Sequence, residues 1–437
     1  MLKINKYSKI IIISAFVLSV FIPTLFNVIQ TRSTRIWSYR TDGYINDLDI
    51  STKGRYLAVG TYDRLYFFDM FENTLLWDKF LQNLHVGSLS MSGDGNFFAA
   101  GVSIVAPNVK GYVYYFDSNS STPLWTYRTS MIRPPVSISS DGEDLAAIYD
   151  LYTIVVFEST NSIPVWNFTT DIQGIGSFKI SSDGSYVIFG DSSGKAYFMN
   201  NSNIPSKRSL WNYTTGDDVG AVAISSNNEY IAVGSDDNKV YLFDKFNSSS
   251  KESILNYTTQ GDILSVEFSS DENSLVVTNT EDRIYYFETN SSIPVWTYLT
   301  TTDILSATIS EDGNYVTAGD LQGNVYLLSC DTGSLVSHYR TKGESYALKI
   351  SSDGNYIACA GHYFDGAISE YRTYLFDRSN PIDGKDFSFV FSAVLQNLLI
   401  FGLPTSFITF SVIYGIEFIL KQRSIKKREI SEKLEEF

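Results

Sequence analysis

The sequence is poor in the residues that build most metal and nucleophile sites. Its 437 residues include two cysteines and three histidines, which excludes a disulfide-rich scaffold and a cysteine-based zinc module. Cationic residues are also scarce, because 33 Lys and Arg stand against 48 Asp and Glu, a formal net charge of −15. Recognition of nucleic-acid phosphates needs a cationic surface. We therefore expect no nucleic-acid partner and no metal site.

Signatures of catalysis are missing as well. The sequence contains no P-loop, nucleophile elbow or HExxH motif. We expect His338 to pack within a strand, and His85 and His362 to lie in loops and face solvent. Cys330 and Cys359 fall on predicted strands, where we expect buried free thiols, with a disulfide as the alternative. The chain is therefore predicted to be a non-enzymatic protein without a cofactor.

Long apolar runs occur only near the two ends of the chain. Residues 10–31 begin with 20 uncharged residues, about enough to cross a ~30 Å hydrocarbon core. We predict a transmembrane signal anchor here, with a cleavable signal peptide as the alternative. Near the other end we predict an interfacial segment at 387–397 and a transmembrane helix at 398–420.

Charge predicts the orientation of these segments. Lysines lie in residues 1–9, and six Lys and Arg follow the second span within the tail 421–437. By the positive-inside rule both termini are expected in the cytoplasm, and the region between the spans outside it at the cell membrane. Residues 37–416 carry 22 basic and 43 acidic side chains, so this exterior region is strongly acidic.

One phrase recurs throughout that region. Two clear copies are LWNYTTGDDVGAVAISSNNEYIAVGSDDNKVYLFD, from Leu210, and VWTYLTTTDILSATISEDGNYVTAGDLQGNVYLLS, from Val295. Eight hairpin turns from residue 53 to residue 353 give a mean spacing of about 43 residues, the period of a β-propeller blade of four short strands. The turns are Lys53-Gly54, Asp94-Gly95, Asp141-Gly142, Asp183-Gly184, Asn227-Asn228, Asp271-Glu272, Asp312-Gly313 and Asp353-Gly354.

The strand count predicts how the ring closes. Eight sets of strands a, b and c follow one another, but only seven d strands lie between them. The eighth d strand is expected at Ile36–Arg40, ahead of all the others, where it would complete the last blade and leave no open sheet edge. We predict an all-β, eight-bladed propeller of four-stranded antiparallel blades over residues 35–381, flanked by the two transmembrane helices. A seven-bladed propeller is the alternative, because the second and last repeats carry long b–c insertions.

These repeats resemble two related propeller families over about 340 residues. The phrase ISSDGxYIAVGSxDxxVYLFD resembles a WD repeat, although the Gly-His dipeptide is missing and strand c ends in Phe-Asp. The junction between strands c and d resembles the tryptophan-docking motif of quinoprotein-like (PQQ-like) propellers, with an acid eight residues before a Trp, as in Asp69 and Trp77. The resemblance implies structural tryptophans that fill the gaps between blades. They are Trp37, Trp77, Trp125, Trp166, Trp211 and Trp296.

The loops between strands d and a carry the most suggestive polar pattern. Blades five to eight place a carboxylate at the same loop position, at Asp218, Asp262, Asp303 and Glu344. These acids would line half of one propeller face, together with Asp236, Asp237, Asp282 and Asp320 in the b–c turns. One interpretation is that Asp is favoured in turns for local hydrogen bonding. The other is an acidic semicircle that attracts a basic peptide or a cation.

We therefore expect a membrane-tethered propeller that acts as a non-enzymatic, extracytoplasmic protein-interaction or ligand-binding module. Its partners would be the membrane, through two spans, and a protein or peptide that is basic. The alternatives are a quinoprotein oxidoreductase of the PQQ type and an envelope-assembly scaffold.

Overall fold

The computed structural model describes residues 33–81, 84–104, 110–172, 174–201, 210–245, 253–341, 343–364 and 369–381. The segments predicted to cross or touch the membrane, 10–31, 387–397 and 398–420, lie outside these ranges. Within the described ranges, no helix has the length and apolar character needed to span a membrane.

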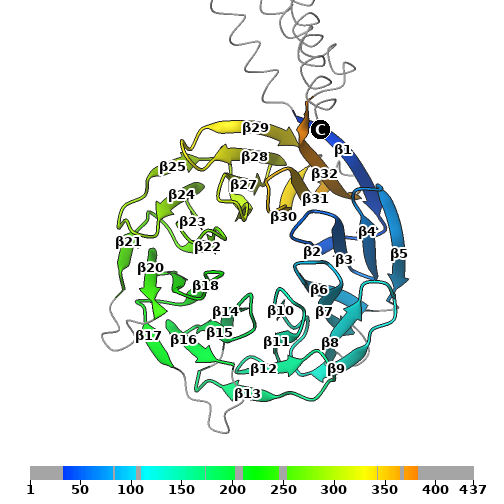
Figure 1. Ribbon diagram of the computed structural model, residues 1–437, viewed down its shortest axis with the longest axis horizontal. Coiled ribbons are helices and arrows are strands. Elements are labelled where there is room, and N and C mark those ends of the chain that lie inside the picture. The colour runs from blue at the N-terminus through cyan, green and yellow to red at the C-terminus, as the bar shows by residue number, and fades with distance from the viewer. Residues whose placement is uncertain are drawn as a thin grey trace, which may run out of the picture. The chain divides into compact units, whose positions relative to one another are not determined.

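Eight four-stranded antiparallel sheets surround a single axis (Figure 1). The predicted eight-bladed propeller is therefore confirmed, and the seven-bladed alternative is wrong. In each blade, strands a, b, c and d follow one another from the axis outward. Blade 1 contains β2 (Ile45–Ile50), β3 (Tyr56–Thr61), β4 (Arg64–Asp69) and β5 (Thr74–Phe80), and blade 2 contains β6 (Leu84–Met91), β7 (Phe97–Ile104), β8 (Lys110–Asp117) and β9 (Trp125–Thr129). Blade 3 contains β10 (Val136–Ile138), β11 (Asp144–Ile148), β12 (Thr153–Glu158) and β13 (Trp166–Thr169), and blade 4 contains β14 (Ile175–Ile180), β15 (Tyr186–Asp191), β16 (Lys195–Asn200) and β17 (Trp211–Thr214).

The second half of the ring repeats this arrangement. Blade 5 contains β18 (Val219–Ile224), β19 (Tyr230–Ser235), β20 (Lys239–Asp244) and β21 (Leu255–Thr258), and blade 6 contains β22 (Ile263–Phe268), β23 (Ser274–Asn279), β24 (Arg283–Glu288) and β25 (Trp296–Leu299). Blade 7 contains β26 (Ile304–Ile309), β27 (Tyr315–Asp320), β28 (Asn324–Ser329) and β29 (Leu335–Arg340). Blade 8 contains β30 (Glu344–Ile350), β31 (Tyr356–Phe364), β32 (Ser369–Pro381) and, from the start of the chain, β1 (Ser33–Thr41).

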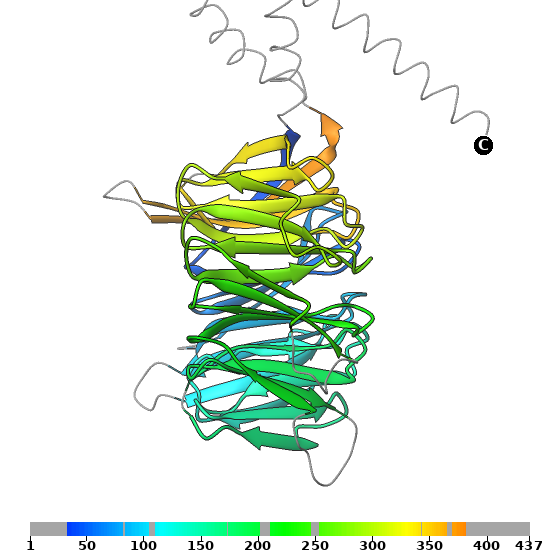
Figure 2. The same ribbon diagram turned by 90° about the vertical axis from the view of Figure 1, so that its left-hand side faces the viewer.

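The ring closes through blade 8. Strand β1 is the neighbour of β32 in the sheet order β1-β32-β31-β30, and the two strands lie side by side in Figures 1 and 2. The predicted d strand at Ile36–Arg40 is thus confirmed and lies within β1. Because d strands start and c strands end at the same face of a propeller, β1 begins and β32 ends at one face. We call it the a–b face, since the a–b turns and c–d loops lie there, and we call the opposite face the d–a face.

The cores lie between blades rather than within them. The buried apolar side chains form eight clusters, and each cluster combines residues from two neighbouring blades. The predicted tryptophans are part of these interfaces. Trp77, for example, stacks on Phe98 of blade 2 at 6.0 Å between ring centroids, and its indole N–H donates to the Ser118 carbonyl at 2.7 Å. Trp125 and Trp296 make the equivalent hydrogen bond to a carbonyl of the next blade, and Trp166 donates instead to the side-chain oxygen Oδ1 of Asn201.

The recurring Ser-x-Asp-Gly phrase builds the a–b turns. In blade 7 the Ser310 hydroxyl donates to Asp312 Oδ1 at 2.6 Å and accepts the Tyr315 N–H at 3.0 Å. Gly313 follows with φ of 70°, a left-handed conformation that glycine adopts without a steric penalty. Asn228 and Glu272 occupy the same position in blades 5 and 6, with φ of 63° and 64°. The turns of adjacent blades are also joined, as in the 2.9 Å bond from the Thr52 N–H to the Gly93 carbonyl.

Candidate functional site

The four predicted carboxylates lie on the d–a face, at the entrance to the innermost strands. Asp218, Asp262 and Asp303 directly precede β18, β22 and β26, and Glu344 begins β30. The backbone of the first three ties the loop to the b–c turn of the same blade. Their carbonyls accept the N–H groups of Asp236, Thr280 and Leu321 at 2.9, 3.0 and 3.0 Å.

Three of these carboxylate groups are unpaired. The side-chain oxygens of Asp218, Asp262 and Asp303 make no hydrogen bond or ion pair with any residue that the structure describes. The first interpretation from sequence, that Asp serves local side-chain hydrogen bonding, therefore does not apply to them. Any residue could supply the backbone bonds, so the fold itself does not require acids at these positions.

The four acids of the b–c turns separate into two groups. Asp237 and Asp320 are structural, because Asp320 is fully buried and accepts the Asn324 N–H at 2.8 Å, and Asp237 accepts the Lys239 N–H at 3.0 Å. Asp236 and Asp282 instead stand beside the loop acids. Burial, followed by the negative charge of Asp262, raises the pKa of Asp236.

A similar crowding occurs one blade further. Burial, followed by the negative charge of Asp303, raises the pKa of Asp282. Each of these pairs joins a b–c turn of one blade to the d–a loop of the next. The acids of blades 5 to 7 are thus close enough to repel one another, which defines an acidic sector of the d–a face.

The d–a face is aromatic at blades 8 and 1. Tyr44 of blade 1 stacks on Tyr346 of blade 8, with ring centroids 5.0 Å apart and planes 8° apart. Tyr44 also meets the edges of Tyr371 at 5.6 Å and Tyr62 at 6.3 Å. This aromatic sector arises where the last blade meets the first, so residues more than 300 positions apart in sequence become neighbours.

Two histidines in this sector correct the sequence-based expectation. His85 lies in β6 and His362 in β31, not in loops, because both strands extend further than the repeat predicted; His362, for example, pairs with Tyr371 across the hairpin. Their rings pack on tyrosines, His85 on Tyr62 at 4.1 Å and His362 on Tyr371 at 4.7 Å. His338 packs in β29, as expected, with Nε2 3.1 Å from Asn324 Oδ1.

The aromatic sector also holds charged groups. Arg133 Nη2 lies 3.0 Å from His85 Nδ1, and its guanidinium lies over the Tyr62 ring at 5.6 Å. Burial, followed by the positive charge of Arg133, lowers the pKa of His85. Glu344, the fourth predicted acid, is 3.9 Å from His362 Nδ1. Glu344 therefore belongs to the aromatic sector, and the structure does not group it with the other three acids.

Side chains on the innermost strands face the axis in a regular ring. One position per blade pairs with the third residue of strand b. Its occupants are Asp49, Ser90, Ser137, Lys179, Ala223, Glu267, Thr308 and Lys349. Four of the eight accept an N–H group from the neighbouring blade. Asp49 accepts from Met91 at 2.8 Å, Ser90 from Ile138 at 3.1 Å, Ser137 from Ile180 at 3.2 Å and Glu267 from Ile309 at 3.3 Å. Strand a is a sheet edge, so these bonds satisfy N–H groups that the sheet leaves unpaired.

Charges from five blades meet near the axis. We define the axial cluster as Asp47, Asp49, Lys179, Glu267, Glu311 and Lys349. Lys349 Nζ lies 3.6 Å from Asp49 Oδ1, and the charge of Asp49, more than any other effect, raises the pKa of Lys349. Burial raises the pKa of Asp47 to about 6, despite hydrogen bonds from the Leu89 and Leu48 N–H groups.

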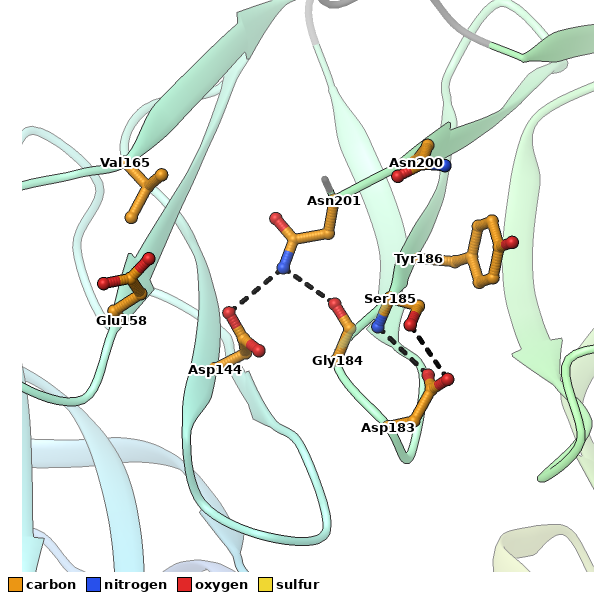
Figure 3. A pocket seen from close by; sticks show the side chains of 9 residues that line it. All are labelled: Asp144, Glu158, Val165, Asp183, Gly184, Ser185, Tyr186, Asn200 and Asn201. Carbon is orange, nitrogen blue, oxygen red and sulfur yellow. Dashed lines mark hydrogen bonds between the residues drawn. The ribbon is translucent and has the colours of Figure 1, made fainter. Parts of the chain in front are cut away.

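A shallow cavity opens on the a–b face between blades 3 and 4 (Figure 3). Asn201 spans its floor, where the side-chain amide donates to Asp144 Oδ1 at 3.1 Å and to the Gly184 carbonyl at 2.7 Å. Burial raises the pKa of Asp144. Within the described part of the chain, no group of three or more His, Cys, Asp or Glu residues is placed to hold a metal ion. The cysteines are free and buried, as expected, and burial raises the pKa of each thiol to about 12.

Comparison with known proteins agrees with this geometry. The family model described as outer membrane protein assembly factor BamB matches residues 201–354, which include the four predicted carboxylates. No curated protein sequence matches the chain. The fold is that of BamB-like and WD40 propellers.

Three solved structures support that assignment of the fold. BamB from Moraxella catarrhalis is 15% identical, with a TM-score of 0.61 over 79% of this chain and 100% of that one. Sqt1 from Chaetomium thermophilum, bound to the N-terminus of ribosomal protein L10, is 13% identical, with a TM-score of 0.63 over 79% of this chain and 100% of that one. The C-terminal WD40 domain of Sif2 is 13% identical, with a TM-score of 0.63 over 78% and 97%. At these identities the likeness establishes the propeller fold alone.

Proposed function

We propose that this protein is a membrane-tethered, non-enzymatic propeller that binds a polypeptide outside the cytoplasm through its d–a face. The observation that carries the proposal is the set of unpaired carboxylates at Asp218, Asp262 and Asp303. Acids that the fold does not use, crowded enough to repel one another, are better explained by a ligand than by stability.

The strand directions support the choice of face. Both β1 and β32 have their outer ends at the a–b face, so the tethers predicted at 10–31 and 398–420 would attach there. Only one residue, Arg32, separates the first predicted span from β1. With so short a link, the a–b face would be turned toward the bilayer. The d–a face would then be free to bind a partner.

The chemistry of the d–a face defines the partner. Its acidic sector favours lysine and arginine side chains. Its aromatic sector favours aromatic or aliphatic ones, and the d–a face also exposes apolar side chains at Ile132, Tyr152 and Ile172. Rings and aliphatic chains around a charged region are typical of protein-binding surfaces. We infer a partner segment that is both basic and apolar.

Binding is tested with a quadruple variant, Asp218→Asn, Asp262→Asn, Asp303→Asn and Glu344→Gln. A photo-crosslinking residue at Ile132 should first identify the partner, with Ile163 on a c–d loop as the matched exposed control. Exposed ion pairs contribute about 0.2–1 kcal/mol each, so the quadruple change should weaken binding of that partner about tenfold. Raising the salt concentration should weaken wild-type binding more than binding of the variant. A folded variant with undiminished affinity would refute the role of the acids.

The predicted topology has its own test. Protease added to intact cells or right-side-out vesicles should digest the propeller and spare the tail after Lys421. Protection of the propeller would contradict the extracytoplasmic location without bearing on the binding face.

Envelope assembly is the second candidate function, and the match of the BamB family model favours it. That family is described as an outer membrane protein assembly factor. In this case the partner crosslinked from the d–a face would itself be a membrane protein or a component of a membrane complex. A soluble ligand protein would favour the simpler binding module.

A further inference from the structure

Arg133 occupies a position of the repeat that every other blade uses for its core. The position lies four residues before the axial ring position, at the start of the innermost strand. Its occupants in the other seven blades are uncharged and buried, and they are Ile45, Val86, Ile175, Val219, Ile263, Ile304 and Ser345. Arg133 is charged and only partly buried. Blade 3 therefore places a cation where the repeat calls for a core residue.

The backbone directs Arg133 away from the core. Its φ is 54°, in the left-handed region that residues other than Gly, Asn and Asp rarely adopt. Pro134 and Pro135 follow, and since proline has no N–H to donate to a ladder, the innermost strand of this blade begins only at Val136.

The core of this interface is filled without the arginine side chain. In blade 2, Val86 packs on strand b of blade 1 so closely that a Cβ added to Gly60 would lie 2.4 Å from Val86 Cγ1. In blade 3 the carbonyl of Pro134 takes that place, because a Cβ added to Gly101 of blade 2 would lie 1.7 Å from the carbonyl oxygen. The side chain of Arg133 is thus not needed to fill the core.

The side chain instead crosses blade 2 and reaches a turn of blade 1. Its stem packs on Gly87, where an added Cβ would lie 2.3 Å from Arg133 Cβ. The guanidinium donates through Nη2 to His85 Nδ1 at 3.0 Å and lies 5.6 Å above the Tyr62 ring. Because a guanidinium has only donors, His85 accepts as a neutral imidazole. Neither neighbour neutralises the charge of Arg133.

Arg133 forms no ion pair with any carboxylate of the described residues. The segments 82–83 and 105–109, which adjoin β6, β7 and β8 in the sequence and lie outside the described ranges, contain no Asp or Glu. A guanidinium has five N–H donors in a planar fork, and His85 accepts from one of its nitrogens. The remaining donors have the geometry that the two oxygens of a carboxylate require.

The guanidinium and the acidic sector lie on different sides of the d–a face. Arg133 reaches over blade 2, which stands opposite blade 6 in the ring of eight (Figure 1). Ile132 and Tyr62 beside it are 52% and 41% exposed, so solvent reaches this part of the face. Asp218, Asp262 and Asp303 belong to the d–a loops of blades 5 to 7. The two sides of the face thus carry charges of opposite sign.

We propose that Arg133 binds a carboxylate of the partner polypeptide, either its C-terminal carboxylate or the side chain of an Asp or Glu. The proposal rests on the polypeptide partner proposed above and gives that partner a direction. The bound segment lies across the d–a face, with its carboxylate over blades 2 and 3 and its basic residues over blades 5 to 7.

The test uses the full-length protein and the variants Arg133→Gly and Arg133→Lys. Glycine adopts the left-handed backbone without a steric penalty, and the core does not need the arginine side chain, so Arg133→Gly should melt close to the wild type. Arg133→Lys keeps the charge but loses the planar fork. Glu272→Gly is the matched control, because it also replaces a left-handed residue, with φ of 64°, but in an a–b turn on the other face.

The probes are fluorescent peptides of about ten alternating lysines and leucines, short segments of the predicted basic and apolar character. One form has a free C-terminal carboxylate, one a C-terminal amide, and one an amide after a final glutamate. Fluorescence anisotropy should show at least about tenfold tighter binding of the two carboxylate forms than of the plain amide by the wild type, because hydrogen bonds between charged groups are gained. Whichever carboxylate form binds more tightly identifies the source of the carboxylate.

The variants assign that preference to Arg133. We expect Arg133→Gly to bind the three peptides alike, Arg133→Lys to keep a smaller preference, and Glu272→Gly to behave as the wild type does. The quadruple variant of the loop acids should bind every form more weakly and still prefer the carboxylate forms, because Arg133 is intact in it.

Three results would overturn the carboxylate site. Equal binding of all three peptides by the wild type would do so and would leave the acidic sector as a binding surface. A preference that persists in Arg133→Gly would place the carboxylate elsewhere. No binding of any form by the wild type would count against both this site and the basic partner proposed for the acidic sector.

Discussion

The interface at which the ring closes includes an aromatic contact of Trp37 that a single substitution removes. Trp37 lies in β1, yet its ring meets the edge of Phe68 in blade 1 at 4.9 Å and an interplanar angle of 74°. It also stacks on Tyr39 at 5.9 Å. Replacing Trp37 by Ala therefore empties part of the interface between β1, which completes the last blade, and the first blade.

The expected cost follows from the burial of the ring. Truncation of a buried tryptophan to alanine costs about 3–5 kcal/mol, and Trp37 is only partly buried, so we expect about 3 kcal/mol. That is a large share of the about 5–15 kcal/mol by which domains are stable. Urea unfolding of the full-length protein, followed by circular dichroism, measures it. Trp37→Phe should recover part of the loss.

An interior interface provides the matched comparison. Trp296 stacks on Tyr286 at 5.0 Å and donates its indole N–H to the Cys330 carbonyl at 2.5 Å. Trp296→Ala should cost as much as Trp37→Ala or slightly more, since a hydrogen bond is also lost. If Trp37→Ala costs less than about 1 kcal/mol while Trp296→Ala costs the full amount, β1 does not close the ring as the structure indicates.

Two further predictions concern a strained turn and a buried acid. Glu272 adopts a φ of 64° at a position where six blades have glycine, so Glu272→Gly should raise the free energy of unfolding by about 1 kcal/mol, whereas Gly313→Ala should lower it; thermal unfolding checks both. Burial raises the pKa of Asp47 to about 6 from an unfolded value of 3.8. The native state then binds more protons than the unfolded state between pH 4 and pH 6, and stability falls as the pH rises through that window. The melting temperature of the wild type relative to Asp47→Asn should accordingly decrease from pH 4 to pH 6, and a constant difference would contradict the raised pKa.

The fold could be predicted because each local signal agreed with the repeat. The turn phrase fixes a hairpin through bonds such as those of Ser310, and alternating apolar residues on both sides of it set the strands. Counting d strands then predicted the role of Ile36–Arg40. The repeat could not predict the extra length of β31, because an inserted segment has no counterpart in the other blades. His362 was misplaced for that reason.

The d–a face was predicted only in part. Loop position alone placed Asp218, Asp262 and Asp303 correctly, because loops of equal length in equivalent blades end at equivalent points. Glu344 shares that position, but the aromatic surroundings of blade 8 come from the long β31–β32 hairpin and from Tyr44 at the other end of the chain. Contacts made by closing the ring have no local signature in the sequence.

An alignment of the repeats places the residues of the axial ring at one equivalent position, but only the structure shows on which side of the strand their side chains lie. Asp49, Lys179, Glu267 and Lys349 stand two residues before the first serine of their turns, so the alignment that revealed the loop acids already held them. Strand periodicity says that such a residue alternates with a buried one, but not whether its side chain meets solvent, a neighbouring blade or the axis. Only the closed ring of eight blades brings Lys179 opposite Lys349. The same position therefore accepts a hydrogen bond from the next blade in four blades, yet carries an ammonium group in blades 4 and 8, a difference that only the closed ring makes visible.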